Sequence, residues 1–144
     1  MDKGHEIILS ALYLLDEIWG RTYLQKFLFL LNSEMYNGDV FKFRKYKYGP
    51  FCDDIINAVT ELDEKHIINE KPVLTRGFKT GYKYSLTYKG KKIAKDIFEN
   101  KLSKKEKDVL IQYKNKFGHY SPTELLKYVY QKFPMYIENS TFDR

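Results

Sequence analysis

The chain has 144 residues, of which 43% are hydrophobic and 17% aromatic, and this composition predicts a packed domain and excludes a disordered chain. The longest apolar run, 27–31, is too short for a membrane span, and the single cysteine, Cys52, excludes an internal disulfide and a cysteine-based zinc site. The net charge of +6 favours a polyanionic partner. A charged N-terminus without an apolar run argues against a signal peptide, so we expect a reducing, cytoplasmic setting.

The first two predicted elements are helices. Apolar residues at helical spacing predict a helix from His5 to Trp19, ended by Gly20. Thr22 is the expected N-cap of the second helix. This second helix is apolar around most of its circumference, which predicts a central place in the core. Its expected buried residues are Leu24, Phe27, Leu28, Leu31 and Met35.

An extended segment and an acidic helix follow. Alternation over 41–48 predicts a short edge strand or extended loop with a basic outer face, which Gly49-Pro50 should end. Asp53 and Asp54 then lie where carboxylates stabilise the start of a third helix, which we expect to end near His66.

A hairpin and three more helices complete the prediction. The two strands of the hairpin are expected over 73–76 and 82–86, and Thr87 should cap the helix that follows. Ser103 should cap a fifth helix, and Ser121-Pro122 with Glu124 predicts the start of a sixth. We therefore divide the chain into residues 1–100, a helical extension over 101–134 packed on them, and a tail over 135–144.

Charge is unevenly distributed along the sequence. Residues 67–116 carry fourteen Lys or Arg against five Asp or Glu, a balance of +9. Residues 53–66 carry five acidic residues against Lys65. Such a split implies two faces with different partners, or an acidic surface turned away from the ligand.

The basic hairpin and the helix after it form the candidate DNA-binding surface. Lysines gathered on one surface favour binding to the phosphate backbone of nucleic acid, although surface lysines also serve simply to keep a protein soluble. The third helix would supply base contacts. The expected DNA-binding residues are Asn57, Thr60, Arg76, Lys79, Lys83, Lys89, Lys91, Lys92 and Lys95. Carboxylates on that helix repel phosphates, so the same face is alternatively a protein-docking surface made by Asp54, Glu61 and Glu64.

Catalysis is not expected, and no residue is assigned a catalytic or metal-binding role. His5, His66 and His119 are far apart in sequence and lack metal-ligand spacing to another His or Cys. The glycines do not form a phosphate-binding loop, and Cys52 lacks a recognisable nucleophile motif. We therefore expect no enzymatic activity and no cofactor.

The chain resembles two known families in different segments. The segment from Leu62 to Ile68, the hairpin, and Tyr84-Ser85-Leu86-Thr87 with Gly90 and Ala94 resemble winged-helix transcriptional regulators. Their pattern is Leu-x-x-x-Gly-Leu-Ile followed by a wing that ends Tyr-x-Leu-Thr-x-x-Gly. His66 replaces the usual Gly, and histidine tolerates the left-handed backbone conformation better than most residues do.

The second resemblance covers the first third of the chain. Thr22-Tyr23-Leu24-Gln25-Lys26-Phe27-Leu28-Phe29, with Tyr48-Gly49-Pro50 later, resembles the SocA-like antitoxin module called the Panacea domain. In that family a Leu-Gln-Lys helix is followed by an extended Tyr-Gly-Pro segment. The resemblance implies recognition of another protein, such as a toxin.

The combined prediction is a mainly helical α+β domain, a winged helix-turn-helix with a small antiparallel β-hairpin and additional C-terminal helices. The preferred function is sequence-specific binding of double-stranded DNA in transcriptional control. The alternative is a protein-interaction module of antitoxin or adaptor type. A homodimer built partly from the fifth and sixth helices is a further hypothesis, and no membrane association is expected.

Overall fold

The computed structural model describes residues 1–75 and 80–137. Its elements, in chain order, are α1 (Lys3–Leu15), β1 (Glu17–Trp19), α2 (Arg21–Tyr36), β2 (Arg44–Tyr46), β3 (Gly49–Phe51), α3 (Asp53–Glu64), β4 (Ile68–Leu74), β5 (Thr80–Leu86), α4 (Tyr88–Asp96), the π-helix η2 (Ile97–Lys101), α5 (Lys104–Phe117), α6 (Pro122–Lys132) and the 3-10 helix η3 (Pro134–Tyr136). The predicted fold class, mainly helical α+β with a hairpin after the third helix and further C-terminal helices, is confirmed.

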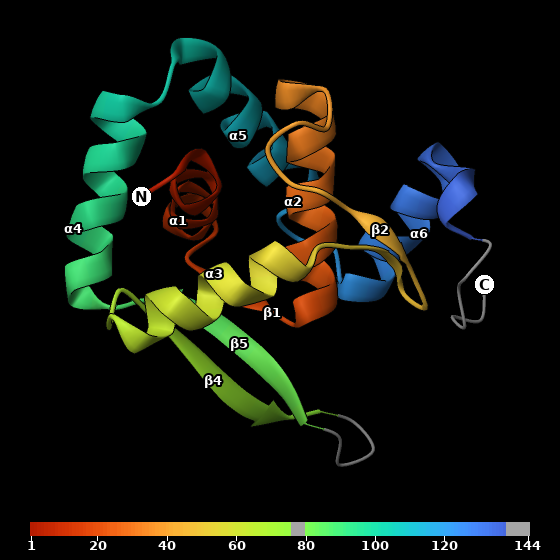
Figure 1. Cartoon of the computed structure of the whole chain (residues 1–144), viewed down its shortest axis with the longest axis horizontal. Coiled ribbons are helices and arrows are strands. Elements are labelled where there is room, and N and C mark those ends of the chain that lie inside the picture. The colour runs from red at the N-terminus through yellow and green to blue at the C-terminus, as the bar shows by residue number, and fades with distance from the viewer. Residues whose placement is uncertain (76–79, 138–144) are drawn as a thin grey trace.

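Helix α1 lies at the centre of the domain. Figure 1 shows it almost end-on, with α2, α3, α4 and α5 around it. Every residue from Ile7 to Leu12 is buried, including the hydroxyl-bearing Ser10. A helix without a solvent-facing side over this length must be enclosed by other elements. Helix α2 is buried from Tyr23 to Asn32, as predicted for the second helix, whereas Met35 is only partly buried.

The predicted first helix is wrong over its last residues. It ends at Leu15 because Asp16 adopts a left-handed backbone angle, φ 70°. Glu17–Trp19 instead form β1, which pairs antiparallel with β5 and buries Ile18 opposite Tyr84. The three-stranded sheet therefore has the order β1-β5-β4. Backbone hydrogen bonds offered by β5 outweigh the helical spacing of this short segment.

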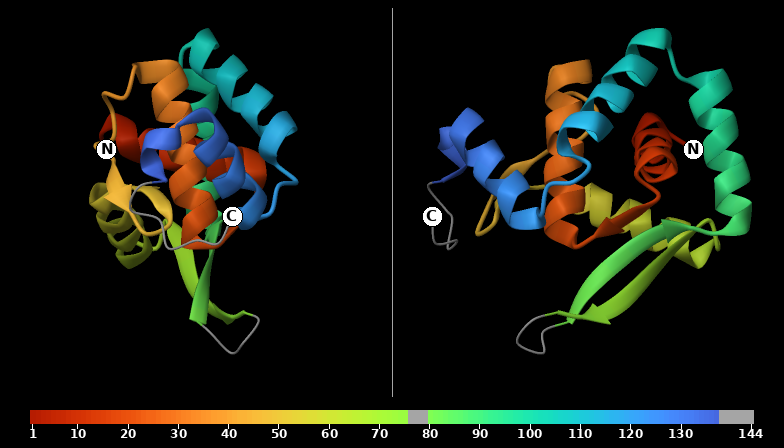
Figure 2. Two further views of the ribbon diagram at one scale, coloured as in Figure 1. Left: turned by 90° about the vertical axis from the view of Figure 1, so that its right-hand side faces the viewer. Right: turned by 180° about the vertical axis from the view of Figure 1, so that it is seen from behind.

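The β4–β5 hairpin is longer than predicted and extends away from the helices (Figures 1 and 2). Its register runs from Ile68 opposite Leu86 to Leu74 opposite Thr80. Ile68 and Leu86 are buried at the root, whereas Leu74 is 75% exposed near the far end. The root is thus part of the core and the far end projects into solvent.

The segment expected to be one edge strand forms its own small ladder. β2 pairs with β3, with Lys45 opposite Pro50. Gly49-Pro50 therefore lies inside a strand and does not end the extended segment, contrary to the prediction. A two-stranded ladder tolerates proline because each strand has an edge that needs no N–H donor.

The helix caps follow the local sequence with one exception. The side chains of Thr87, Ser103 and Ser121 each accept a hydrogen bond from the third residue of their helix, as predicted. Thr22 is not a cap, because α2 already begins at Arg21 and its N-cap is Gly20. His66 has the left-handed φ of 59° expected where the related motif has glycine.

Helices α5 and α6 complete the core against the first two helices. α5 packs on α1 and α2, and α6 packs on α2 (Figure 2). Their apolar stripes are buried within the single chain, with Leu110, Leu125 and Val129 all at 0% exposure. The proposed division at residues 100 and 134 and the homodimer remain predictions.

Candidate functional site

The lysines of α4 form a compact exposed group. Lys91, Lys92 and Lys95, here called the α4 basic patch, border a hollow of about 370 Å³ that Leu12 and Leu86 also line. The Lys92 ammonium lies 4.6 Å from the ring centre of the exposed Tyr88. These three lysines are the part of the predicted basic surface that the structure brings together.

The β4–β5 hairpin contributes less unpaired positive charge than the sequence implies. The Lys83 ammonium lies 3.9 Å from a Glu17 carboxylate oxygen and 5.1 Å from the Trp19 ring centre, so β1 partly neutralises it. Lys89 Nζ is 3.5 Å from the Lys65 carbonyl oxygen, at the end of α3. Arg76 and Lys79 lie outside the described residues.

The predicted α3 residues are all exposed, but they divide between two environments. Asp54, Asn57 and Glu61 line a groove of about 510 Å³, here called the α3 groove. Thr60 and Glu64 are exposed outside this groove. The other residues that line the groove are Asp2, Lys3, Gly4, His5, Asp39, Val40, Phe41 and Ala58. Asn57 is thus placed among carboxylates, apart from the α4 basic patch.

The α3 groove is acidic after its ion pairs are considered. Glu61 is paired with Lys65 at 2.9 Å, and this hydrogen bond lowers the pKa of Glu61. The Lys3 ammonium is 3.0 Å from Glu106, so its charge is already balanced. Within the described residues, the carboxylates of Asp39 and Asp54 have no hydrogen bond or ion pair. They give the groove unneutralised negative charge.

A third candidate site is the junction between the Leu-Gln-Lys part of α2 and the segment Tyr48-Gly49-Pro50, which runs from a turn into β3. The Gln25 side chain donates to the Cys52 carbonyl at 3.0 Å and accepts from the Cys52 N–H at 2.8 Å. Gly49 has φ +84°, and a Cβ there would lie 2.9 Å from Leu126 Cδ1 and 3.3 Å from Lys26 Cε. Glycine is therefore required both by the backbone angle and by the close approach of α2 and α6.

Lys26 is the most unusual side chain of this junction. It is 1% exposed, and within residues 1–75 and 80–137 it has no hydrogen bond or ion pair. Burial lowers the pKa of Lys26 from 10.5 to about 7, because the charged form loses its hydration. It lines a recess of about 260 Å³ together with residues from α2, β2, β3 and the turn between those strands.

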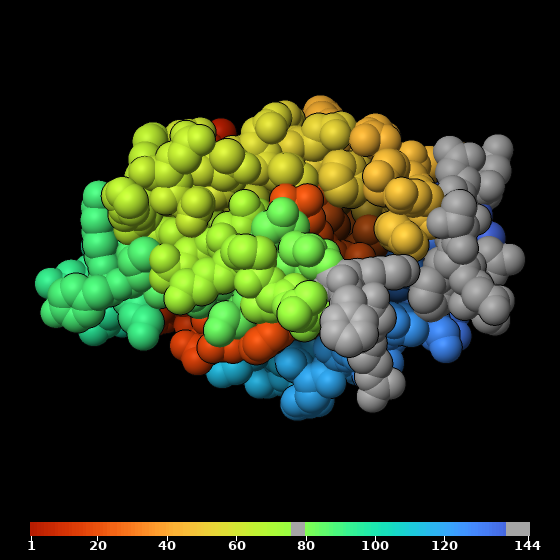
Figure 3. Space-filling view, turned by 90° about the horizontal axis from the view of Figure 1, so that it is seen from below, coloured from red at the N-terminus to blue at the C-terminus, as the bar shows by residue number. Residues whose placement is uncertain are grey.

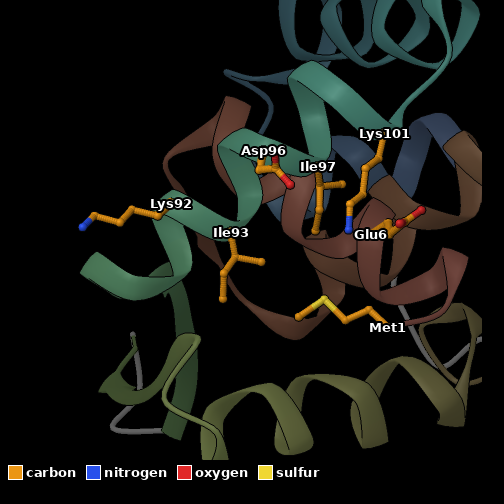
Figure 4. A pocket seen from close by; sticks show the side chains of 7 residues that line it. All are labelled: Met1, Glu6, Lys92, Ile93, Asp96, Ile97 and Lys101. Carbon is orange, nitrogen blue, oxygen red and sulfur yellow. The ribbon is translucent and has the colours of Figure 1, made fainter.

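A further hollow, of about 490 Å³, lies between the N-terminus and α4–η2. Figure 4 shows Ile93 and Ile97 beside Met1, whereas Lys92 extends away from the other side chains. The residues that line this hollow carry charges of both signs, with Glu6 and Asp96 acidic and Lys92 and Lys101 basic. This hollow therefore lacks the concentration of one charge that marks the α3 groove.

Two negative findings concern the described residues only. Residues 1–75 and 80–137 contain no group of three or more His, Cys, Asp or Glu side chains placed to hold a metal ion. In the same residues, no helix combines the length and apolar character that crossing a bilayer requires.

Sequence reasoning missed Gln25 and Lys26 as site residues. The sequence did contain a signal for both residues. A helix that is apolar around most of its circumference has little solvent-facing surface, so an amide and an ammonium group within it should be buried. Their partners could not be inferred, since the contacts of Gln25 are backbone atoms 27 residues away.

Comparison with known proteins supports the second of the two resemblances. The family model for the antitoxin SocA-like, Panacea domain matches residues 24–134, which is most of the chain. This range includes the Leu-Gln-Lys helix, the Tyr-Gly-Pro strand, the hairpin and α6. No curated protein matches the sequence significantly. The resemblance to winged-helix regulators finds no support in these comparisons.

Proposed function

The chain belongs to the antitoxin SocA-like, Panacea domain family, and we propose that it acts as a non-enzymatic antitoxin module that binds a basic toxin protein through the α3 groove. The family match favours this alternative over transcriptional control. The observation that carries the choice of surface is the pair of unneutralised carboxylates, Asp39 and Asp54, in one groove.

The charge distribution supports a basic partner. The whole chain is basic, at +6, so a groove dominated by carboxylates is a local departure from the rest of the surface. Complementary charge across an interface raises the association rate and rejects partners of the wrong sign. A toxin with a positively charged surface would therefore be steered to the α3 groove and away from the α4 basic patch.

Capture and rescue of growth test this proposal. The wild-type chain is used to capture proteins from its source cells, and each captured protein is expressed alone to find one that arrests growth. Wild-type chain should restore growth, and the isosteric pair Asp39→Asn with Asp54→Asn should restore it poorly. The association rate of the pair should fall about tenfold or more at low salt, with a smaller difference at high salt.

A matched control removes two exposed acids elsewhere, Glu99→Gln with Asp108→Asn. This control should bind and rescue like wild type. Equal association rates for both double variants would exclude the α3 groove as the docking surface. If the wild-type chain restored growth with none of the captured growth-arresting proteins, the antitoxin function itself would be contradicted.

DNA binding is a second candidate, favoured by one observation. Lys91, Lys92 and Lys95 are exposed together on α4, and like charges gathered in this way suit a phosphate backbone. Base reading needs a helix inserted into a DNA groove, and the α3 carboxylates disfavour this insertion because they repel the phosphates. The binding supported by this patch is therefore contact with phosphates alone.

A further inference from the structure

A recess beside the start of α2 contains the chemistry of a small-molecule site. Figure 3 shows the start of α2 set back between the hairpin and the β2–β3 segment. The recess has a volume of about 260 Å³. Its lining residues are Arg21, Thr22, Gln25, Lys26, Tyr46, Tyr48 and Phe51. It is separate from the α3 groove, with which it shares no lining residue.

The ammonium group of Lys26 has no hydrogen-bond or charged partner among the described residues, and its nitrogen keeps a small contact with the solvent of the recess. The neighbouring Gln25 makes two hydrogen bonds, whereas Lys26, equally buried, makes none with any described residue. Burying an unpaired ammonium is unfavourable, and an apolar side chain would fill the same space without that cost. A buried amine that lines an open recess is suited to a counter-ion that enters from solvent.

The surroundings favour an anion. The described residues that line the recess include no carboxylate, and Arg21 lies at its edge. Arg21 is only partly balanced, since its guanidinium is 3.8 Å from a Glu70 oxygen. The first turn of α2 also borders the recess, and no side chain caps its N–H groups. Free N–H groups at a helix start attract negative charge.

The opposite wall is aromatic. Tyr46 and Phe51 lie with ring centres 4.7 Å apart, and Tyr48, 42% exposed, lies at the rim. The Lys47 ammonium is 5.6 Å from the Tyr48 ring centre and 5.8 Å from that of Tyr46. Such a wall suits a flat apolar body whose charged end faces Lys26.

We propose that this recess binds a small organic anion, a carboxylate or phosphate group carried on an aromatic body, with Lys26 as its counter-ion. The aromatic body packs on Tyr46, Tyr48 and Phe51, and the anionic group accepts hydrogen bonds from Lys26 Nζ. This site goes beyond the proposed antitoxin function and does not depend on it.

Binding at this site is coupled to protonation. An anion prefers the ammonium form of Lys26, so the bound state must raise the pKa of that amine. The charged and titratable groups that line the recess with Lys26 are Arg21 on its own helix and Tyr46 and Tyr48 on the β2–β3 hairpin. Arg44 and Lys47 lie against the rings of this hairpin, and Tyr130 on α6 lies beside Gly49. Since free Lys26 has a pKa of about 7, the protonated fraction falls roughly fiftyfold from pH 7 to pH 9, and affinity falls with it.

Nuclear magnetic resonance of the lysine side chains tests the proposal on the intact chain. The titration midpoint of Lys26 is followed with phenyl phosphate, with benzoate, and with neutral benzyl alcohol. At least one anion should raise the midpoint by one pH unit or more, equal to a tenfold preference for the ammonium form. Benzyl alcohol should leave it unchanged. A midpoint shift with phenyl phosphate alone, or with benzoate alone, identifies which class of anion the recess accepts.

Two variants locate the effect. Lys26→Met should abolish binding of the effective anion in calorimetry, and Lys42→Met, an exposed control, should retain it. Failure of both anions to move the Lys26 midpoint in wild-type chain would overturn the proposal, and this result needs no variant to fold. Equal binding by folded Lys26→Met would overturn it as well.

Discussion

The side-chain amide of Gln25 and the backbone of Cys52 form a closed pair of hydrogen bonds, at 3.0 Å from Nε2 to the carbonyl and 2.8 Å from the N–H to Oε1. Both residues are fully buried. About two helical turns further along α2, Asn32 makes similar hydrogen bonds to residues 40 and 41. Its side chain donates to the Phe41 carbonyl and accepts from the N–H groups of Val40 and Phe41. Two buried amides thus hold both ends of residues 40–52 against α2.

The first prediction tests this attachment. Gln25→Leu keeps the volume but leaves the Cys52 N–H and carbonyl without partners. The free energy of unfolding should fall by about 2–5 kcal/mol, the cost of two unsatisfied buried groups. Chemical denaturation measures it. Gln112→Leu on the exposed face of α5 should change stability by no more than about 0.5 kcal/mol. If both variants were equally stable, the amide pair would not contribute to the fold.

A second prediction concerns the glycine of the Leu-Thr-x-x-Gly segment. A Cβ at Gly90 would lie 1.8 Å from the Ile67 carbonyl oxygen, a backbone atom that also accepts from the Thr87 hydroxyl at 3.0 Å. Gly90→Ala must therefore displace α4 from the hairpin root. We expect a loss of about 3 kcal/mol or more, by analogy with severe overpacking. Thermal unfolding monitored by circular dichroism measures the change.

Lys91→Ala, one position further along α4, is the matched control, because Lys91 is exposed. It should unfold within a few degrees of wild type. A Gly90→Ala protein with an unchanged melting temperature would show that the contact relaxes without cost, and the requirement for glycine would then be wrong.

Signals confined to a few residues were predictable from the sequence. The Ser103 cap of α5 and the capping box of α6 occur as expected, and Glu106 completes a capping box in α5 as well. Such a box needs only a serine and a glutamate three residues apart. The left-handed His66 was likewise readable from its motif. In each case the interacting groups lie within one helical turn, so no knowledge of the fold is required.

Features that depend on distant partners were not predictable. Glu17–Trp19 form a strand only because β5, more than sixty residues later, offers them backbone hydrogen bonds. The α3 groove combines Asp2, Asp39 and Asp54 from three separate segments. The isolation of Lys26 depends on Gly49 and on α6 closing over it. Periodicity along one chain contains no information about such encounters.

A third prediction addresses DNA. If the α4 basic patch binds phosphates, Lys91→Ala with Lys95→Ala should weaken nonspecific DNA binding and reduce the slope of log K against log salt by roughly 0.9 for each lost contact. Lys104→Ala with Lys105→Ala on α5 removes the same charge from another exposed site. Equal slopes for the two double variants would mean that the patch makes no particular phosphate contact.

The last prediction uses the pH dependence of stability. The pKa of Lys26 is about 7 in the folded chain and near 10.5 when unfolded, so between these values the unfolded state holds the extra proton. Stability from this group therefore rises with pH, by about 1.4 kcal/mol per unit, and is lowest at and below pH 7. Burial raises the pKa of Tyr23 and Tyr113 to about 12, which has the opposite effect once unfolded tyrosines ionise near pH 10. The useful window is thus pH 7 to 9.5.

Comparison of wild type with Lys26→Met isolates the lysine, because Cys52 and the tyrosines titrate alike in both proteins. The unfolding free energy of the variant, minus that of wild type, should be largest at pH 7 and should fall by about 3 kcal/mol on reaching pH 9.5. Urea denaturation at six pH values measures this difference. The exposed Lys42→Met should show a constant difference from wild type throughout. A constant difference for Lys26→Met would mean that Lys26 keeps its proton in the folded chain, and the buried amine would then need a partner that balances its charge.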